Sequence, residues 1–192
     1  MSRPPLKILI AGATGVLGRA TLPHLAGHDV LGVTRDGAKA GALEAAGARA
    51  AECDVYAPGA FARIAAEFAP DVVVNFLTDL ARGPGPANAR IREVGGPIVS
   101  AAARGSGARR LVVESIAFSG APASMQAVAA LEADARASGL EALVLRFGRF
   151  WGPGTWSVES APEAPAVHVG EAGRRAAELI LTGAPGDHVI AD

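Results

Sequence analysis

The sequence GATGVLG, residues 12–18, carries three glycines at intervals of three residues. An apolar run over 6–11 precedes it, and an amphipathic run over 16–25 follows it at once. A strand, a glycine turn and a helix N-terminus in this order bind the pyrophosphate of a dinucleotide, because the helix begins with unpaired N–H groups and the positive end of its dipole. Gly12 permits the tight turn, Gly15 lets the backbone approach phosphate, and Gly18 lets the helix pack closely on the strand. A glycine-rich turn of another α/β protein is the alternative, and the flanking patterns favour the dinucleotide.

The elements that must position this turn alternate along the chain. We expect strands near 6–11, 29–34, 48–52, 71–76, 109–114, 141–146 and 187–190, and helices near 16–26, 37–46, 59–68, 88–105, 123–138 and 170–182. Such alternation predicts an α/β protein of Rossmann type, a doubly wound parallel sheet covered by helices on both faces. Because no long linker or internal repeat interrupts the pattern, residues 1–192 are expected to form a single compact domain.

Composition narrows the class of partner. The net charge is −1 and no basic stripe is present, which disfavours nucleic acid. Cys53 is the single cysteine, so an intrachain disulfide is impossible, and this fits a reducing cytoplasm. No run of about 18 apolar residues predicts a membrane span, and no His, Cys or carboxylate cluster has the spacing of metal ligands. We therefore expect a cytoplasmic protein with a small-molecule substrate, no metal and no membrane contact.

Six segments resemble the short-chain dehydrogenase/reductase superfamily in its extended or atypical form, which includes NAD-dependent epimerases/dehydratases and NmrA-like proteins. They are GATGVLG (12–18), CDV (53–55), VVVNFLTD (72–79), RRLVVESIAFSG (109–120), LRFGRFWGPG (145–154) and VHV (167–169). The resemblance covers nearly the whole chain and implies a nicotinamide dinucleotide. It places Asp54 at the adenine amino group and 72–79 beside the nicotinamide ribose. The residues expected to hold the cofactor are Gly12, Thr14, Gly15, Val16, Leu17, Gly18, Arg35, Asp54, Val55, Leu77 and Thr78.

The end of the second expected strand bears on the choice of cofactor. Thr34 stands where family members that use NAD commonly carry aspartate, and Arg35 follows it. A guanidinium beside a non-acidic residue suits a 2′-phosphate, so NADP(H) is favoured over NAD(H). The alternative is that Arg35 stacks on the adenine while Asp36 caps the next helix.

The catalytic pair usual in this superfamily is missing. Its members normally use Tyr-x-x-x-Lys, in which the tyrosine transfers a proton and the lysine lowers the pKa of the tyrosine. Here the single tyrosine is Tyr56, and the two lysines, Lys7 and Lys39, lie far from the expected position.

The helix that should carry the pair can still be aligned. If Glu132 matches the glutamate that follows the family's lysine, Ser124 takes the place of the tyrosine and Val128 that of the lysine. Thirty-eight residues follow Gly154, so the C-terminal substrate region is expected to be reduced to a loop.

Other polar residues are candidates for catalysis. Ser115 could form a hydrogen bond with substrate, or it could satisfy backbone groups after a strand. Asp79 could serve as an acid or base, or it could be a solvated loop residue. Together with Ser124 these are the catalytic candidates. His168 could act on a proton, although family members often carry a structural histidine at the start of this helix.

The loop after residue 148, called the late loop below, offers substrate contacts. Arg146 and Arg149 could clamp an anion, and a structural ion pair is the alternative for Arg146. Trp151 and Trp156 could form a flat apolar wall over a ligand, or they could pack the loop onto the domain.

These features predict a small NADPH-dependent oxidoreductase, or an epimerase/dehydratase-like enzyme, that lacks the usual Tyr/Lys pair. The alternatives are a non-catalytic, NmrA-like redox sensor and a pathway protein that uses the scaffold for non-redox chemistry. The Trp and Arg residues of the late loop favour the enzyme. The resemblance also implies a possible homodimer through the helices near 88–105 and 123–138.

Overall fold

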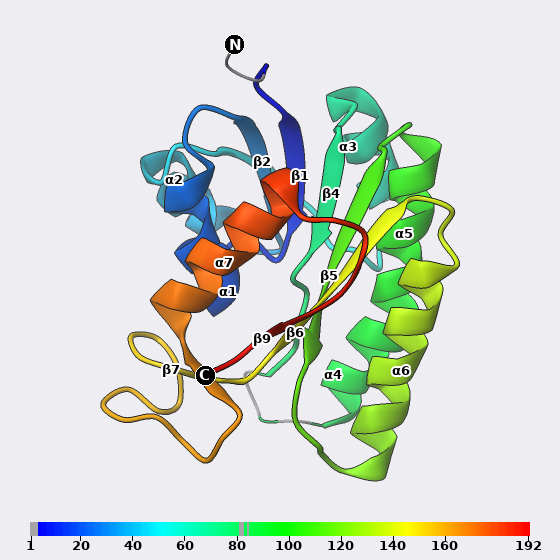
Figure 1. Ribbon diagram of the computed structural model, residues 1–192. Helices are drawn as coiled ribbons and strands as arrows, with labels where there is room; N and C mark the ends of the chain where they lie inside the picture. The colour runs from blue at the N-terminus through cyan, green and yellow to red at the C-terminus, as the bar shows by residue number, and fades with distance from the viewer. Residues whose placement is uncertain (1–3, 81–82, 84) are drawn as a thin grey trace.

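Seven parallel strands form one sheet in the order β3-β2-β1-β4-β5-β6-β9, with helices on both faces (Figure 1). The computed structural model describes residues 4–80, 83 and 85–192. The strands are β1 (Lys7–Ala11), β2 (Asp29–Thr34), β3 (Arg49–Glu52), β4 (Val72–Asn75), β5 (Arg110–Ile116), β6 (Glu141–Phe147) and β9 (Gly186–Ile190). The order of strands changes direction between β1 and β4, which makes the sheet doubly wound. The expected Rossmann-type α/β fold is confirmed.

Helices occur wherever the sequence predicts them. They are α1 (Val16–Thr21), α2 (Ala40–Ala45), α3 (Ala60–Phe68), α4 (Pro86–Arg90), α5 (Gly96–Gly105), α6 (Pro122–Arg136) and α7 (Val169–Thr182). Short turns of other helix types extend three of them, namely 3₁₀ turns η1 (Leu22–Leu25) and η2 (Gly37–Lys39) and the π-helical turn η3 (Ile91–Gly95). η1 follows from Pro23, which lacks the N–H that would continue α1.

A second, two-stranded sheet was not expected. It pairs β7 (Arg149–Trp151) with β8 (Ala166–His168), so the two ends of the late loop are tied together. Strands of three residues are too short to show an alternation of apolar and polar side chains.

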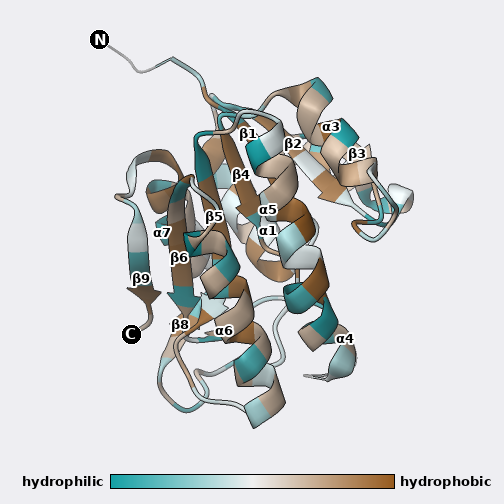
Figure 2. Cartoon of the chain, turned by 90° about the vertical axis from the view of Figure 1, so that its right-hand side faces the viewer, coloured by the Kyte–Doolittle hydropathy of each residue, from teal (hydrophilic) through white to brown (hydrophobic). Residues whose placement is uncertain are grey.

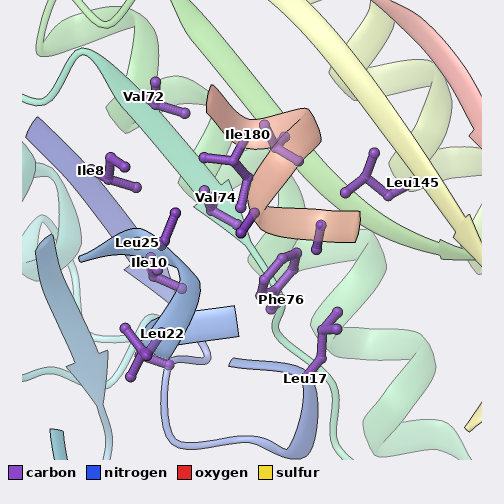
Figure 3. Packing of buried hydrophobic residues seen from close by; sticks show 14 of the residues in the cluster. Ile8, Ile10, Leu17, Leu22, Leu25, Val72, Val74, Phe76, Leu145 and Ile180 are labelled. Carbon is purple, nitrogen blue, oxygen red and sulfur yellow. The ribbon is translucent and has the colours of Figure 1, made fainter. Parts of the chain in front are cut away.

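The core has two layers, one on each face of the sheet. Beneath α1 and α7, apolar side chains of β1, β4, β5 and β6 form one cluster, and Figure 3 shows Ile8, Val74 and Ile180 among its members. A second cluster lies under α3, α5 and α6. Figure 2 shows hydrophobic strands inside the molecule and polar residues on outward faces of the helices. Every residue of β4 is buried, as expected for a central parallel strand.

α1 and α7 lie against each other over this sheet (Figure 1). A Cβ at Gly173 would overlap the carbonyl group of Ala20, so only glycine permits the approach. Among the described residues, no helix is long and apolar enough to span a membrane.

Candidate functional site

The glycine turn connects β1 to α1 and packs against the backbone that follows β4. Gly12 has φ +85°, and a Cβ there would lie 2.5 Å from the carbonyl oxygen of Phe76. The N–H of Gly15 donates to the carbonyl oxygen of Gly12 at 3.0 Å, which closes the turn. A Cβ at Gly18 would lie 2.5 Å from that same carbonyl oxygen, so the helix passes directly over the turn. Side chains at either position would occupy the turn, and glycines keep it open.

The start of α1 presents free backbone to a ligand. Gly15 is exposed at the N-cap and no side chain caps the helix. The first N–H groups of a helix have no partner within it, so they remain available to an anion. Val16 is half-buried and Leu17 belongs to the core, which fixes the direction of the helix. This turn fits the phosphates of a dinucleotide.

Threonines line the turn on the β2 side. Thr34 is buried, and its hydroxyl lies 3.5 Å from the hydroxyl of Thr14. The carboxylate of Asp36 accepts the N–H of Ala38 at 3.1 Å and caps η2. The carboxylate of Asp36 is therefore engaged with η2 rather than with Arg35.

Arg35 instead meets a carboxylate from another strand. Its guanidinium lies 3.7 Å from the carboxylate of Asp79, which follows β4. The N–H of Asp79 donates to the side-chain oxygen of the buried Asn88 at 3.0 Å, so α4 helps to place Asp79. The candidate acid or base Asp79 thus lies next to the candidate cofactor residue Arg35.

The segments after β3 and β4 complete this end of the sheet. Asp54 is exposed, and its carboxylate accepts the N–H of Tyr56 at 3.0 Å. Val55 is buried in the second cluster. Leu77 donates its N–H to the side-chain oxygen of Asn75 at 3.1 Å, and Thr78 follows it, half-buried. The cofactor candidates therefore come together at one edge of the sheet.

Ser115 is fully buried and bonded to the helix that should carry the missing pair. Its hydroxyl donates to Glu132 on α6 at 2.6 Å. Arg146 binds both oxygens of that carboxylate, at 2.8 and 2.6 Å. These hydrogen bonds from Arg146, followed by those from Ser115 and Arg136, lower the pKa of Glu132 to about 2. Arg146 thus forms the structural ion pair that the sequence left as an alternative.

The substitutes for the missing pair lie on α6. Ser124 is half-buried in the first turn and Val128 is buried. The structure gives Ser124 no hydrogen-bond partner among the residues it describes, and it gives Val128 a packing role.

The late loop holds three of the remaining candidates in different environments. Arg149 stacks on Phe118, 4.5 Å from the ring centre, and donates to the carbonyl oxygens of residues 163 and 164. Trp151 packs edge-on against His168, which caps α7 by accepting the N–H of Gly170. Trp156 is 73% exposed.

Comparison with known proteins gives the family. Residues 8–115 match the model of the NAD dependent epimerase/dehydratase family. The chain belongs to this family. It is 34% identical to a 3-diazoavenalumate denitrifying reductase of Streptomyces, over 86% of this chain and 63% of that protein. The family member described here therefore spans less than two thirds of that relative's length.

Solved structures share the fold of this epimerase/dehydratase family member. The enzyme WbmH of Bordetella bronchiseptica, in complex with NAD⁺, superposes with a TM-score of 0.80 at 16% identity, covering 97% of this chain and 76% of that one. UDP-glucose 4-epimerase of Thermus thermophilus, in complex with NAD, gives a TM-score of 0.77 at 16% identity over 97% and 78% of the two chains.

Two buried polar residues near the carboxyl ends of β4 and β5 were not predicted from the sequence. Asn88 is a buried amide in α4, and nothing in its local pattern distinguishes it. Glu114 is a buried carboxylate in β5. The signal that could have identified it is a charged residue within a strand that the sequence predicts to be buried on both faces.

Proposed function

We propose that this family member is an NADP(H)-binding reductase acting on a small electrophilic organic substrate. The observation that carries the proposal is the glycine turn, where close approaches at Gly12 and Gly18 exclude side chains beside the free N–H groups of α1. When bound, the reduced nicotinamide supplies a hydride, and the protein has to position the two reactants. The reductase from Streptomyces supports a reductive reaction on an organic compound.

NADP(H) is proposed over NAD(H) because of Arg35. Arg35 directly follows β2 and the buried Thr34, and the carboxylate of Asp36 is occupied in capping η2. A planar guanidinium matches the oxygens of a 2′-phosphate. Asp54 and Thr78 are proposed for the adenine and the nicotinamide ribose, as the resemblance implies.

The proposed substrate side is the late loop. Trp156 offers a flat apolar face at the surface, and Arg149 holds the loop backbone with its side chain. An aromatic substrate fits such a face better than a sugar nucleotide would, since stacking supplies the contact. Ser124, half-buried and without a partner among the described residues, is the proposed hydroxyl contact.

The test mixes the purified protein with NADPH and a panel of quinones, flavins, aldehydes and a diazo compound, and follows the absorbance of the reduced nicotinamide. Calorimetry measures the binding of NADPH and NADH separately. The proposal predicts NADPH binding and oxidation with at least one class of substrate. An absence of binding for both nucleotides would refute it.

A non-catalytic sensor is the second candidate. The specific observation in its favour is that serine and valine occupy the positions aligned with the catalytic pair, at 124 and 128. Nucleotide binding without turnover of any member of the panel would favour the sensor over the reductase.

A second copy of the chain is the proposed partner. The outward face of α6 carries small exposed side chains, namely Ala129, Ala130 and Ala133, and the neighbouring Val94 is 45% exposed. Small side chains let helices approach closely, and an exposed apolar face favours association. Light scattering should give a dimer mass, and Val94→Asp should shift it toward a monomer. A monomer mass for the unmodified protein would refute this partner.

A further inference from the structure

Two side-chain contacts join segments that follow different strands of the sheet. Because β1 lies between β2 and β4, the ion pair of Arg35 with Asp79 joins the segments on either side of β1, at whose end the glycine turn begins. The second contact joins the loop after β3 to the helix after β4, since the guanidinium of Arg90 lies over the ring of Tyr56, 4.3 Å from its centre. Both contacts lie at the edge of the sheet where the cofactor candidates gather.

The stack of Arg90 on Tyr56 rests on fixed backbone at both ends. Val55, the residue before Tyr56, is buried in the second cluster, and a Cβ at Gly95 in η3 would lie 3.7 Å from its side chain. The carboxylate of Asp54 accepts the N–H of Tyr56 and holds the loop. Arg90 is the last residue of α4 and directly precedes η3. The packing of η3 on this loop therefore keeps the two stacked side chains together.

The helix α4 also connects this stack to the ion pair of Arg35. Asn88, two residues before Arg90, is buried and accepts the N–H of Asp79 at 3.0 Å. Burial raises the pKa of the Tyr56 phenol, and the positive charge of Arg90 opposes this rise. The charges of Asp79 and Arg35 act on the same phenol. Since water and salt screen charges that lie more than about 10 Å apart, both guanidinium groups lie near the ring of Tyr56.

Arg90 is a cation that no carboxylate neutralises. Among residues 4–80, 83 and 85–192, its side chain interacts with the ring of Tyr56 and forms no ion pair. Arg35, by contrast, shares its charge with Asp79. A phosphate monoester carries a charge of about −1.5 to −2 at pH 7, so a single arginine that is already paired does not balance it. The charge that remains to be balanced matches the free guanidinium of Arg90.

We propose that Arg90, stacked on Tyr56, is a second cation for the 2′-phosphate of NADP(H) and acts beside Arg35 as a specificity residue. This inference rests on the proposed NADP(H)-binding function. The ligand class is a nucleotide that carries a phosphate monoester on the ribose of its adenosine. Arg90 binds the phosphate oxygens through its planar guanidinium.

Tyr56 is a positioning residue in this site. Its ring holds the guanidinium of Arg90 by a cation–π contact, which reduces the side-chain freedom that the arginine loses when the phosphate binds. Tyr56 is the single tyrosine of the chain and lies far from the helix that carries the catalytic tyrosine in relatives. Its ring therefore serves cofactor binding.

The test uses two probes that differ by the 2′-phosphate and needs no turnover. Calorimetry measures the binding of adenosine 2′,5′-bisphosphate and of AMP to the unmodified protein and to Arg90→Ala. The variant should bind the bisphosphate about 10-fold more weakly, because it loses a charge-assisted hydrogen bond, and should bind AMP with unchanged affinity. NADPH and NADH should show the same contrast.

Arg104→Ala is the matched control. Arg104 is exposed like Arg90 and forms no ion pair within the described part of the chain, but it lies in the last turn of α5, toward the amino end of β5. Its removal takes away the same charge and should change none of these affinities.

The role of Tyr56 needs a conservative and a disruptive variant. Tyr56→Phe keeps the ring and should keep the affinity for the bisphosphate. Tyr56→Leu removes the aromatic face and should weaken that affinity about 3-fold, the scale of an exposed cation–π contact. In the Arg90→Ala background, Tyr56→Leu should have little further effect, because the two residues act as a unit. Thermal unfolding of each variant checks that it is folded.

The outcomes separate this inference from the proposed function. Equal losses for the bisphosphate and AMP in Arg90→Ala would assign Arg90 to the part of the nucleotide that both share, and this would overturn the phosphate role. Unchanged affinities in Arg90→Ala would overturn it as well. In both cases the proposed function stands as long as the unmodified protein binds NADPH. Failure of the unmodified protein to bind NADPH would overturn the proposed function and with it this inference.

Discussion

The hydroxyl of Ser115 on β5 donates a 2.6 Å hydrogen bond to the carboxylate of Glu132 on α6. The same carboxylate accepts two hydrogen bonds from Arg146 on β6. One buried acid therefore ties two central strands to the helix on which the family normally carries its catalytic pair. In this chain these hydrogen bonds attach α6 to β5 and β6. In relatives that have the Tyr/Lys pair, the same helix carries the residue that transfers a proton.

The first prediction concerns acid stability. The pKa of Glu132 is about 2 in the folded protein, below its ordinary value of 4.5. A depressed pKa contributes stability that is present above the unfolded value and lost as pH falls from about 4.5 toward 2. Glu132→Ala should cost about 2 kcal/mol at pH 7, because the buried hydroxyl of Ser115 loses its acceptor and the half-buried Arg146 keeps only Asp187, at 3.0 Å. Urea unfolding at pH 7 and pH 3 measures both effects, and an equal loss at the two pH values would contradict them.

The second prediction has the opposite sign. Glu114 has a folded pKa of about 7, above its ordinary 4.5, so the folded state binds the proton more tightly than the unfolded state. Stability should therefore fall as pH rises from about 4.5 through 7, since ionisation must take place in a buried site. Glu114→Gln should be more stable than the unmodified protein at pH 8, by up to about 3 kcal/mol. Thermal unfolding of the free protein between pH 5 and 8 tests this, and parallel pH curves for the two proteins would rule it out.

The third prediction addresses the cofactor. Arg35→Ala should weaken NADPH binding about 10- to 100-fold and NADH binding little, since only NADPH carries the 2′-phosphate. Arg49→Ala is a matched control, because Arg49 is equally exposed (60% against 59%) and is also paired with an aspartate. Arg49 lies at the amino ends of the strands, away from the turn. Calorimetry with both nucleotides is the measurement, and equal losses for NADPH and NADH would remove the phosphate argument.

The fourth prediction concerns the carboxylate that holds Arg35. A 2′-phosphate must compete with Asp79 for the guanidinium, which lies 3.7 Å away. Asp79→Asn should therefore strengthen NADPH binding a few-fold, the scale of an exposed ion pair, and leave NADH binding unchanged. If Asp79 served instead as a catalytic acid or base, the variant would lose turnover at saturating NADPH, so kcat distinguishes the two roles.

The fifth prediction uses two glycines with different surroundings. Gly12→Ala should abolish nucleotide binding and destabilise the protein, because φ is +85° and the new Cβ would meet the carbonyl group of Phe76. Gly41→Ala, within α2, meets nothing within 4 Å and should stabilise the protein by roughly 0.5–1 kcal/mol. Unfolding curves and calorimetry on both variants give the comparison, and a Gly12→Ala protein that still binds nucleotide would contradict the proposed path of the phosphates.

Local patterns in the sequence were sufficient to predict the fold. The alternation of apolar strands with amphipathic helices follows from burial on two faces of a parallel sheet, and the glycine turn follows from backbone conformations open only to glycine. The alternation and the glycine turn can each be recognised from consecutive residues. β7 and β8 escaped prediction because each has three residues and gains its stability from the other, across a long loop.

For the candidate site too, some features follow from the sequence and others only from the tertiary structure. The sequence by itself determined the glycine turn, the arginine that follows β2 and the absence of a Tyr/Lys pair, because each is a matter of residue type and spacing. The tertiary structure alone decided which polar and charged groups interact: Arg35 with Asp79, Ser115 with Glu132, and Arg146 with Glu132. The physical reason is that these encounters depend on strand register and on the face to which each side chain points. A shift of one residue in the register of β5 would turn Ser115 away from α6 and its partner Glu132.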